Sequence, residues 1–452
     1  MGIKGLWPKL ATAKDTRLLN EFCLTQGFQK NYREQRSVIL GVHASDLLEN
    51  LKASTHRYPC AHAGSPTETF FSILCKFSEA AAVFMFVFDG PASPKHKQNE
   101  EGIYQDARRL ILHFGYYLLE AEGEAGPFLA SLSHSHVIDG VISEDSDLLA
   151  LGVDLVLRIS RDQSLHDLVY NIHTLNAIKQ IMRLEQEGII LVAILSGNSL
   201  HAGLEGCGVA TSIQLGRSDL GRLLVAKFRN LSQHPPALRA FLRSWRSKLH
   251  KELKDNARGF LTNRRLQAAK SVDDGFPNLD ALNRYVNATP SLPQAYVEDL
   301  SAILKPRQPD ITRIVSFCQE QWHWSNSQVI EQFSKSFWKG MMLRMLQSPL
   351  VLYDQNQHIF RERHWRMDLI RESPDRKFQN AIEYVQVTVS VTGILAVAAL
   401  STPRPVEQVA WVPLPVLLVS KLPRSLGQLH FDLAVSGVAN VELEAADQDV
   451  NA

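Results

Sequence analysis

The chain has 452 residues, of which 45% are hydrophobic and 8% aromatic, a composition typical of a folded protein with two or three domains. Its 48 Lys and Arg nearly balance its 47 Asp and Glu, so the net charge of +1 does not indicate a nucleic-acid partner, and any DNA-binding surface must be local. The five cysteines show no C-x-x-C pair and no zinc-ligand spacing, a pattern typical of a protein in a reducing compartment.

The sequence shows no membrane-directing segment. The first seven residues lack the apolar run and small-residue cleavage site of a signal peptide. Between residues 385 and 392, valines alternate with polar residues, and this period of two predicts a strand and not a membrane span. We therefore expect no membrane partner.

The first two hundred residues have the pattern of an α/β unit. Short apolar runs rich in β-branched or aromatic residues predict buried parallel strands at residues 37–42, 83–88, 140–142 and 189–195. Helical patterns, for example at residues 67–82 and 105–114, separate these runs. The prediction is a mainly parallel sheet flanked by helices, with chemistry at the carboxyl ends of its strands.

The second half of the chain begins with a basic helical segment. An apolar stripe at helical spacing runs through Leu238, Leu242, Trp245 and Leu249. Residues 237–270 contain ten Lys or Arg against two acids, which gives this segment a net charge of +8. Further helices are predicted at 319–347, a small β-rich module at 350–435, and an acidic disordered tail at 436–452.

Four acidic residues stand where the predicted strands end. Asp89 follows the strand at 83–88, Asp145 and Asp147 follow the strand at 140–142, and Glu124 lies on the loop between them. A parallel sheet would gather these carboxylates, whose mutual repulsion a divalent cation relieves. Two Mg²⁺ ions at such a site support phosphodiester hydrolysis. Taken singly, however, aspartates after strands also close turns or cap helices.

Five motifs in a fixed order resemble the XPG-type flap-endonuclease family. They are the opening MGIKGLW, the run VFDGP at 87–91, GEA at 123–125, SEDSD at 143–147, and ILSG followed by GLEGCG at 194–208. The resemblance implies a PIN-like nuclease fold, with the XPG N and I regions in residues 1–200 and a helix-two-turn-helix element within residues 201–345. In that element the family contacts DNA phosphate through a K⁺ ion, which here implicates Gly203, Gly206 and Gly208, and the resemblance also implicates Gly2.

The later segment resembles the Holliday-junction-resolving branch of the family as it occurs in fungi. The residues that carry this resemblance are Trp245 to Lys254, FPNL at 276–279, Tyr285, and WVP at 411–413 in a chromodomain-like module. It implies cleavage of 5′ flaps or four-way junctions during DNA repair, with up to two Mg²⁺ or Mn²⁺ ions held by Asp89, Glu124, Asp145 and Asp147. A second copy on junctions and a nuclear location are also implied.

Three of the seven acidic positions typical of the family carry other residues. His43 replaces an aspartate, Gly126 a glutamate, and Asn198 or Ser199 another aspartate. His43 is either a ligand for Mn²⁺ or a buried, hydrogen-bonded histidine, and Asp46 is either a substitute acid or a turn cap. Two hypotheses follow: a nuclease with impaired activity, or an inactive pseudo-nuclease that binds branched nucleic acid or a protein partner.

Basic residues supply candidate DNA contacts. Lys95 and Lys97 stand near the place where the family has basic residues over the scissile phosphate. Arg239, Arg243 and Arg246 lie on neighbouring turns of the predicted basic helix, which suits them to a phosphate backbone. In each segment the alternative is a solvated surface.

Overall fold

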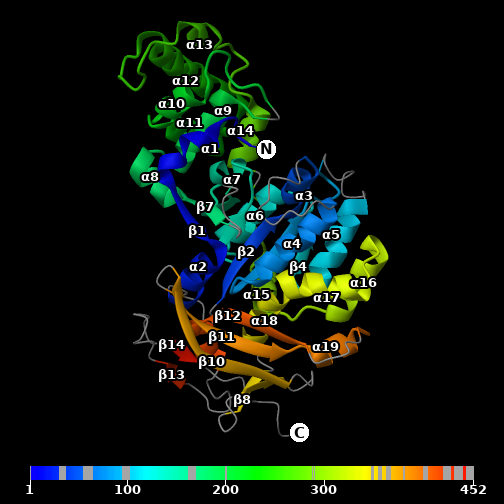
Figure 1. Ribbon diagram of the computed structural model, residues 1–452. Coiled ribbons are helices and arrows are strands. Elements are labelled where there is room, and N and C mark those ends of the chain that lie inside the picture. The colour runs from blue at the N-terminus through cyan, green and yellow to red at the C-terminus, as the bar shows by residue number, and fades with distance from the viewer. Residues whose placement is uncertain are drawn as a thin grey trace.

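The computed structural model describes the chain except for residues 1, 30–36, 54–64, 94–101, 161–168, 199–200, 288, 290, 348–350, 355–358, 363–367, 380–381, 401–405, 421–428, 432–440 and 444–452. Figure 1 shows three parts: a helical lobe, a central sheet flanked by helices, and a β-rich module that carries the C-terminal part. The predicted Lys95 and Lys97 lie outside the described residues.

The central sheet has seven strands in the order β1-β7-β6-β5-β2-β3-β4. The pairs β6–β5, β5–β2, β2–β3 and β3–β4 are parallel, whereas β7 is antiparallel to both of its neighbours. This arrangement confirms the mainly parallel sheet. The strands are β1 (Lys14–Leu18), β2 (Val38–His43), β3 (Ala82–Phe88), β4 (Tyr117–Glu120), β5 (Gly140–Ile142), β6 (Leu155–Ile159) and β7 (Val169–Thr174).

Both faces of the sheet are buried by helices. Alternate residues of β3 enter different hydrophobic cores: Phe84, Phe86 and Phe88 pack on one side, and Val83, Met85 and Val87 on the other. The helices of this part are α1 (Leu6–Lys9), α2 (Leu19–Leu24), α3 (Ala44–Ala53), α4 (Pro66–Ser78), α5 (Gly102–His113), α6 (Ala125–His134), α7 (Asp147–Ala150) and α8 (Leu175–Met182), with short turns at η1 (Ala11–Ala13) and η2 (Thr25–Gln29).

The helical lobe corrects one prediction. Residues 189–195, predicted as a strand, belong to α9 (Gln186–Ser196). A continuous apolar run of this length fits a buried strand or a buried helix equally well, and here the run is buried on every side among neighbouring helices. The lobe continues with α10 (Val209–Gly216), α11 (Leu220–Leu231), α12 (Pro235–Asp255), α13 (Leu266–Lys270) and α14 (Leu279–Val286).

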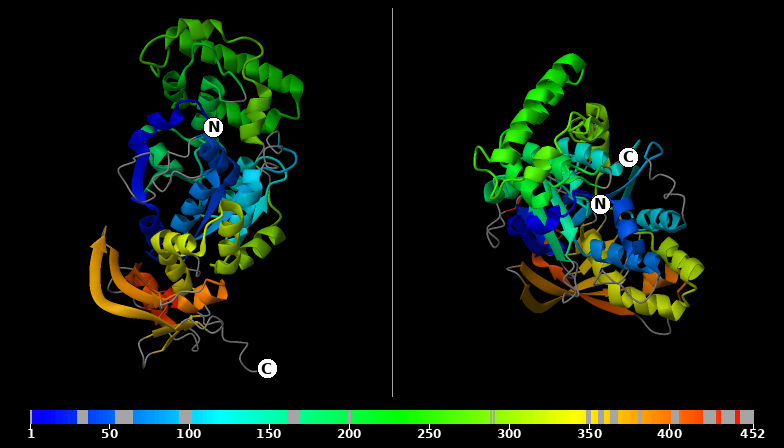
Figure 2. Two further views of the ribbon diagram at one scale, coloured as in Figure 1. Left: turned by 45° about the vertical axis from the view of Figure 1, so that its right-hand side comes forward. Right: turned by 90° about the horizontal axis from the view of Figure 1, so that it is seen from above.

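A further group of helices joins the sheet to the β-rich module. They are α15 (Gln294–Ile303), α16 (Ile311–Trp322), α17 (Asn326–Gln332), η5 (Phe333–Phe337) and α18 (Trp338–Gln347). The apolar side chains of α16, α17, η5 and α18, Trp338 among them, share one core with Val385, Val387 and Val389 of the module, whereas Leu300 of α15 lies in the other core. The left view of Figure 2 shows helices of this group between the sheet and the module.

The module is an antiparallel sheet of five strands in the order β12-β11-β10-β9-β8. Its elements are β8 (Val351–Asp354), β9 (Ile359–Glu362), β10 (Asp368–Gln379), β11 (Ile382–Ser390), α19 (Thr392–Val397), β12 (Glu407–Pro413) and α20 (Leu414–Ser420). The β-rich prediction and the period-two strand near residue 387 are confirmed.

The acidic tail differs in part from its prediction of disorder. A separate hairpin pairs β13 (Leu429–Phe431) with β14 (Val441–Leu443), so three residues of the predicted tail form a strand. The rest of the tail lies outside the described residues. Within the described part of the chain, no helix combines the length and the apolar character needed to cross a bilayer.

Candidate active site at the carboxyl edge of the sheet

The strand order reverses beside β2, and the predicted site residues lie at this point. The chain moves from β2 outward to β3 and β4, then returns to place β5 on the other side of β2. At such a switch point the loops after neighbouring strands diverge and leave room for a ligand. His43 ends β2, Asp89 follows β3, Glu124 lies between β4 and α6, and Asp145 follows β5.

Asp89 ties the loop after β3 to the loop after β4. Its Oδ1 accepts a hydrogen bond from the Ala125 amide at 2.8 Å, at the start of α6. Its own amide donates to Ser45 Oγ at 3.1 Å, at the start of α3. Asp89 is buried, so these bonds fix it among three strand-end loops and bring it beside Glu124, the residue before Ala125.

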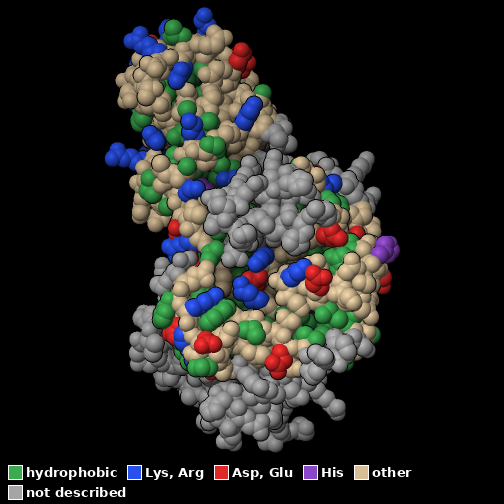
Figure 3. All heavy atoms as spheres, in the orientation of Figure 1, with side chains coloured by type: hydrophobic (Ala, Val, Ile, Leu, Met, Phe, Trp, Pro, Cys, Tyr) green, Lys and Arg blue, Asp and Glu red, His purple; other side chains and the backbone are tan. Residues whose placement is uncertain are grey.

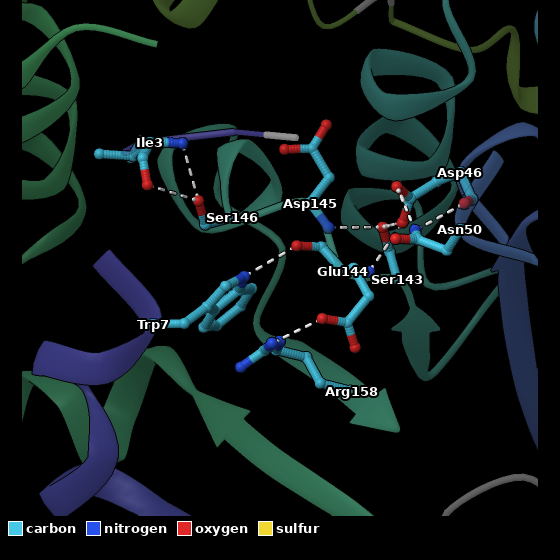
Figure 4. Close-up of polar contacts among 9 residues, drawn as sticks. All are labelled: Ile3, Trp7, Asp46, Asn50, Ser143, Glu144, Asp145, Ser146 and Arg158. Carbon is cyan, nitrogen blue, oxygen red and sulfur yellow. Dashed lines mark hydrogen bonds and ion pairs between the residues drawn. The ribbon is translucent and has the colours of Figure 1, made fainter. Parts of the chain in front are cut away.

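Asp46 is neither a simple turn cap nor a free acid. Its Oδ2 accepts hydrogen bonds from Ser143 Oγ at 2.9 Å and from the Glu144 amide at 2.8 Å, as Figure 4 shows. A second contact joins His43 Nδ1 to Ser143 Oγ at 3.3 Å, and His43 is buried. The interpretation of His43 as a buried, hydrogen-bonded histidine therefore agrees with the geometry of the described residues.

The N-terminal residues pack directly on the turn that carries Asp145. The Ile3 amide donates to Ser146 Oγ at 2.8 Å, and the Trp7 indole donates to the Glu144 carbonyl at 2.8 Å (Figure 4). Gly2 has φ +94°, and a Cβ added to it would lie 2.4 Å from Asp145 Oδ1. Only glycine fits this approach, so the predicted Gly2 belongs to the edge of the carboxylate site.

Asp145 and Asp147 are paired acids in a poorly solvated place. The Asp147 amide donates to Asp145 Oδ1 at 3.0 Å. Burial raises the pKa of Asp145, and the charge of Asp46 raises it further. Burial, followed by the charge of Asp145, raises the pKa of Asp147 to about 7. A second negative charge at this pair is therefore costly near neutral pH.

Helix α14 brings a cation to the neighbouring Glu124 from a distant part of the chain. Arg284 forms a two-pronged ion pair with Glu124, in which Nη1 lies 2.7 Å from Oε1 and Nη2 contacts Oε2. The next residue, Tyr285, donates its hydroxyl to Asp147 Oδ1 at 2.9 Å. Burial lowers the pKa of Arg284, but the bond to Glu124 and the charges of Glu124 and Asp147 raise it above its usual value overall.

The replaced aspartate position contributes to the same cluster. Asn198 donates its amide to the Tyr285 hydroxyl at 2.7 Å and more weakly to Asp147 Oδ2 at 3.4 Å. An aspartate at this position would place a third negative charge beside Asp147, whereas the amide donates a hydrogen bond. Gly126, the replaced glutamate position, is buried in the first turn of α6.

As arranged here, these acids do not fit a site for two divalent ions. Among the described residues, no three His, Cys, Asp or Glu side chains are grouped so that they could hold a metal. Both carboxylate oxygens of Glu124 accept hydrogen bonds from Arg284. The two carboxylate oxygens of Asp147 accept hydrogen bonds from Tyr285 and Asn198. The carboxylates that the resemblance assigns to metal are thus bonded to the protein.

The predicted glycine-rich turn joins α9 to α10, and its backbone is closely packed. Gly203 has φ +77°, and a Cβ there would lie 2.5 Å from the Gly197 amide nitrogen. Gly206 has φ +77° and approaches the backbone of Ala268. Gly208, by contrast, is exposed before the first residue of α10 and has no atom within 4 Å of an added Cβ.

The three predicted arginines of α12 differ in surroundings. Arg239 and Arg243 are exposed, opposite the buried Leu238, Leu242 and Trp245. Arg246 instead donates to the Asp274 and Phe276 carbonyls and pairs with the Asp274 carboxylate at 2.7 Å. Figure 3 shows that Lys and Arg side chains gather on the helical lobe, where few acids are visible.

Arg284 is the site residue that the sequence analysis missed. It lies 160 residues from Glu124, in a helix of mixed polarity, and one arginine in such a helix carries no signal of its own. The only hint was the neighbouring Tyr285, which belongs to the segment that resembles the junction-resolving branch.

Comparisons with known proteins agree with this fold and this order of motifs. Residues 115–199 match the family model of the XPG I-region. A stretch of 142 residues is 25% identical to the DNA repair protein RAD2 of Saccharomyces cerevisiae; it covers 30% of this chain but only 12% of that much longer protein.

Two kinds of solved structure share the architecture. The Holliday junction-resolving enzyme GEN1 in complex with product DNA and Mg²⁺ has a TM-score of 0.72 at 22% identity, over 93% of this chain and 96% of the other. The catalytic core of Rad2 with DNA substrate has a TM-score of 0.51 at 20% identity, over 74% and 99%. The predicted resemblance to the XPG-type nucleases is thus confirmed: the chain contains a match to the XPG I-region and shares its fold with the solved structure of GEN1.

Proposed function

We propose that this chain is an XPG-type structure-specific nuclease that recognises 5′ flaps or four-way junctions and whose hydrolytic activity is impaired. The observation that carries the proposal is the match over 93% of the chain to an enzyme described with product DNA, combined with Asp89, Glu124, Asp145 and Asp147 at one edge of the sheet. Residues 1–200 would form the nuclease region and residues 201–345 the region that tracks DNA.

DNA would be held by phosphate contacts on the helical lobe. The turn from Gly203 to Gly208 would offer backbone groups to a phosphate, with K⁺ between them; a related structure is described as binding potassium. Arg239 and Arg243 are exposed on one side of α12 and would add contacts that depend on salt and not on sequence. Binding would therefore respond to DNA shape.

Impairment follows from the state of the carboxylates. Mg²⁺ or Mn²⁺ would need oxygens that are bonded here to Arg284, Tyr285 and Asn198, so a metal ion would first have to displace these groups. The replacements at His43 and Gly126 remove two further acids. We expect slow cleavage compared with a site that has the full acidic set.

The second candidate is a pseudo-nuclease that binds branched nucleic acid, or a protein partner, without cutting. The Arg284–Glu124 ion pair favours it, because that contact neutralises a carboxylate without a metal. For both candidates we propose a role in DNA repair in the nucleus, in keeping with the repair protein that it resembles. A second copy on four-way junctions is a further proposed partner.

A cleavage assay tests the proposal. Labelled 5′-flap and four-way-junction DNA would be incubated with the full chain and Mg²⁺ or Mn²⁺, beside the Asp145→Ala variant. Slow cutting that disappears in the variant supports the impaired nuclease. Junction binding without cutting, equal in both proteins, supports the pseudo-nuclease. If neither binding nor cutting occurs, the nuclease and the nucleic-acid-binding form of the pseudo-nuclease are both wrong, which leaves only a pseudo-nuclease that binds a protein partner.

A further inference from the structure

We infer that Arg284 is a built-in counter-ion of the carboxylate site: its guanidinium replaces a divalent cation at Glu124, and helix α14 holds the site closed without metal. This inference deepens the proposed function, because it assigns the impairment to one contact in addition to the missing acids. It concerns the binding of metal ions at the same edge of the sheet and does not depend on DNA binding.

The first observation is the geometry of the ion pair. A guanidinium and a carboxylate joined through two parallel hydrogen bonds form the strongest and most directional of the common ion pairs. Arg284 and Glu124 make this contact with side chains that are 29% and 21% exposed, so water screens it less than it would a surface pair. A metal ion at Glu124 must first displace this group.

The second observation is that α14 contacts two carboxylates and not one. Tyr285 donates to Asp147, whose other oxygen accepts from Asn198, and Tyr285 itself is buried. Two adjacent residues of one helix, Arg284 and Tyr285, therefore bind the carboxylates of Glu124 and Asp147. Since Glu124 belongs to the loop after β4 and Asp147 begins α7, which follows β5, α14 links these two segments.

The third observation is that α14 is held firmly in this position. Its N-terminus is capped by Asn278, whose side chain accepts from the Ala281 amide at 2.9 Å. Leu282 is buried in the core of the helical lobe. The segment before α14 is fixed by Arg246, which donates to the Phe276 carbonyl at 3.1 Å. Arg284 is thus presented to Glu124 by a packed helix.

The consequence is a competition between Arg284 and divalent cations. With Arg284 in place, the Arg284–Glu124 pair has no net charge to offer a metal ion, and the remaining acids at Asp89, Asp145 and Asp147 are divided between separate hydrogen bonds. Removal of the guanidinium would free a carboxylate at the mouth of the site and leave its negative charge unbalanced, which favours a hard cation. Loss of Arg284 should therefore increase metal binding. Loss of an arginine from an ion pair elsewhere in the structure should not.

The test is a titration of the full-length protein with Mn²⁺ alone, with free Mn²⁺ measured by electron paramagnetic resonance. The proteins are the wild type, Arg284→Gln, and the double variant Arg284→Gln/Glu124→Gln. Arg258→Gln is the matched control, because Arg258 also pairs with an acid, Asp219, but on the helical lobe away from the sheet edge. No DNA is present, so failure of the proposed function leaves this result unaffected.

We expect Arg284→Gln to bind Mn²⁺ at least about tenfold more tightly than the wild type, a difference of about 1.4 kcal/mol. The double variant and Arg258→Gln should bind like the wild type. Equal Mn²⁺ affinity in the wild type and Arg284→Gln would overturn the inference, as would a gain that persists in the double variant. If Arg284→Gln does not fold, Arg284→Lys is titrated with Mn²⁺ in its place, beside the wild type. A tight, saturable Mn²⁺ site in the wild type contradicts a built-in counter-ion.

Discussion

At the scale of single residues, the carboxylates of the sheet edge are distinguished by what each one contacts. Asp89 and Asp46 accept backbone N–H groups and so hold loops together. Asp147 is different, because burial and the nearby Asp145 raise its pKa to about 7. Its ionisation therefore affects the stability of the fold near neutral pH.

We predict that Asp147→Asn stabilises the protein above neutral pH. The folded-state pKa of Asp147 exceeds the usual 3.8, so the folded protein keeps a proton that the unfolded chain releases, and the free energy of unfolding falls as pH rises from about 4 to about 7. Asparagine does not ionise and removes this loss. Calorimetry should show Tm raised by about 2–4 °C at about pH 8, with little change at about pH 5. Equal destabilisation at both pH values would contradict the prediction.

At the scale of elements, the sequence predicted most strands and helices but not all of their types. The strands β2, β3 and β5 lie within a residue of their predicted positions, because their apolar runs are short and bounded by loops. The run at residues 189–195 became helix α9 because a continuous apolar segment has no periodicity that separates the two structures. The glycine-rich segment that follows α9 was correctly predicted as a turn, because the positive φ angles of Gly203 and Gly206 favour glycine.

The turn between α9 and α10 gives a prediction with an internal control. Gly203→Ala should lower the free energy of unfolding by more than about 1 kcal/mol, because its φ is positive and the added Cβ meets the backbone of Gly197. Gly208→Ala has open space and negative φ, so its change should stay within about 0.5 kcal/mol. Urea denaturation measures both. Equal losses at the two positions would show that the turn is not packed as described.

The surface of α12 gives a prediction about DNA. Replacing Arg239 and Arg243 together by alanine should make the negative slope of log affinity against log salt shallower by about 2 for four-way-junction DNA, about one unit for each phosphate contact. Arg246→Ala should leave the slope unchanged but lower the free energy of unfolding by about 1–3 kcal/mol, since Arg246 is bonded within the lobe. Fluorescence anisotropy over a range of salt concentrations gives the slopes. A slope that falls only in Arg246→Ala would contradict this assignment.

At the scale of the whole molecule, the candidate site is assembled from three distant parts of the chain. Gly2 and Ile3 cover the turn at Asp145, the segments after β3, β4 and β5 place the acids along one edge of the sheet, and α14 contacts both Glu124 and Asp147. Sequence reasoning proposed the acids because strand ends converge at one edge of a parallel sheet and because the motifs that contain them resemble the XPG family. It missed Arg284 because the approach of α14 depends on packing within the lobe, and no local pattern reports that packing.

The β-rich module is part of the same folded unit. Its Val385 and Val387 lie in one hydrophobic core with the helices beside the central sheet, so the predicted boundary near residue 350 does not separate two independent cores. The helical lobe, the sheet edge and the module therefore belong to one folded unit (Figure 1), an arrangement that suits the proposed recognition of a DNA shape.

The most direct test of the central proposal is the affinity of the full chain for a four-way junction compared with linear duplex of the same length and sequence content. Both would be measured by competition at one physiological salt concentration with no divalent cation. We predict a preference of at least about 10³ for the junction, in the range typical of specific binding. Equal affinity for junction and duplex would contradict recognition of branched DNA, whatever the state of the carboxylate site.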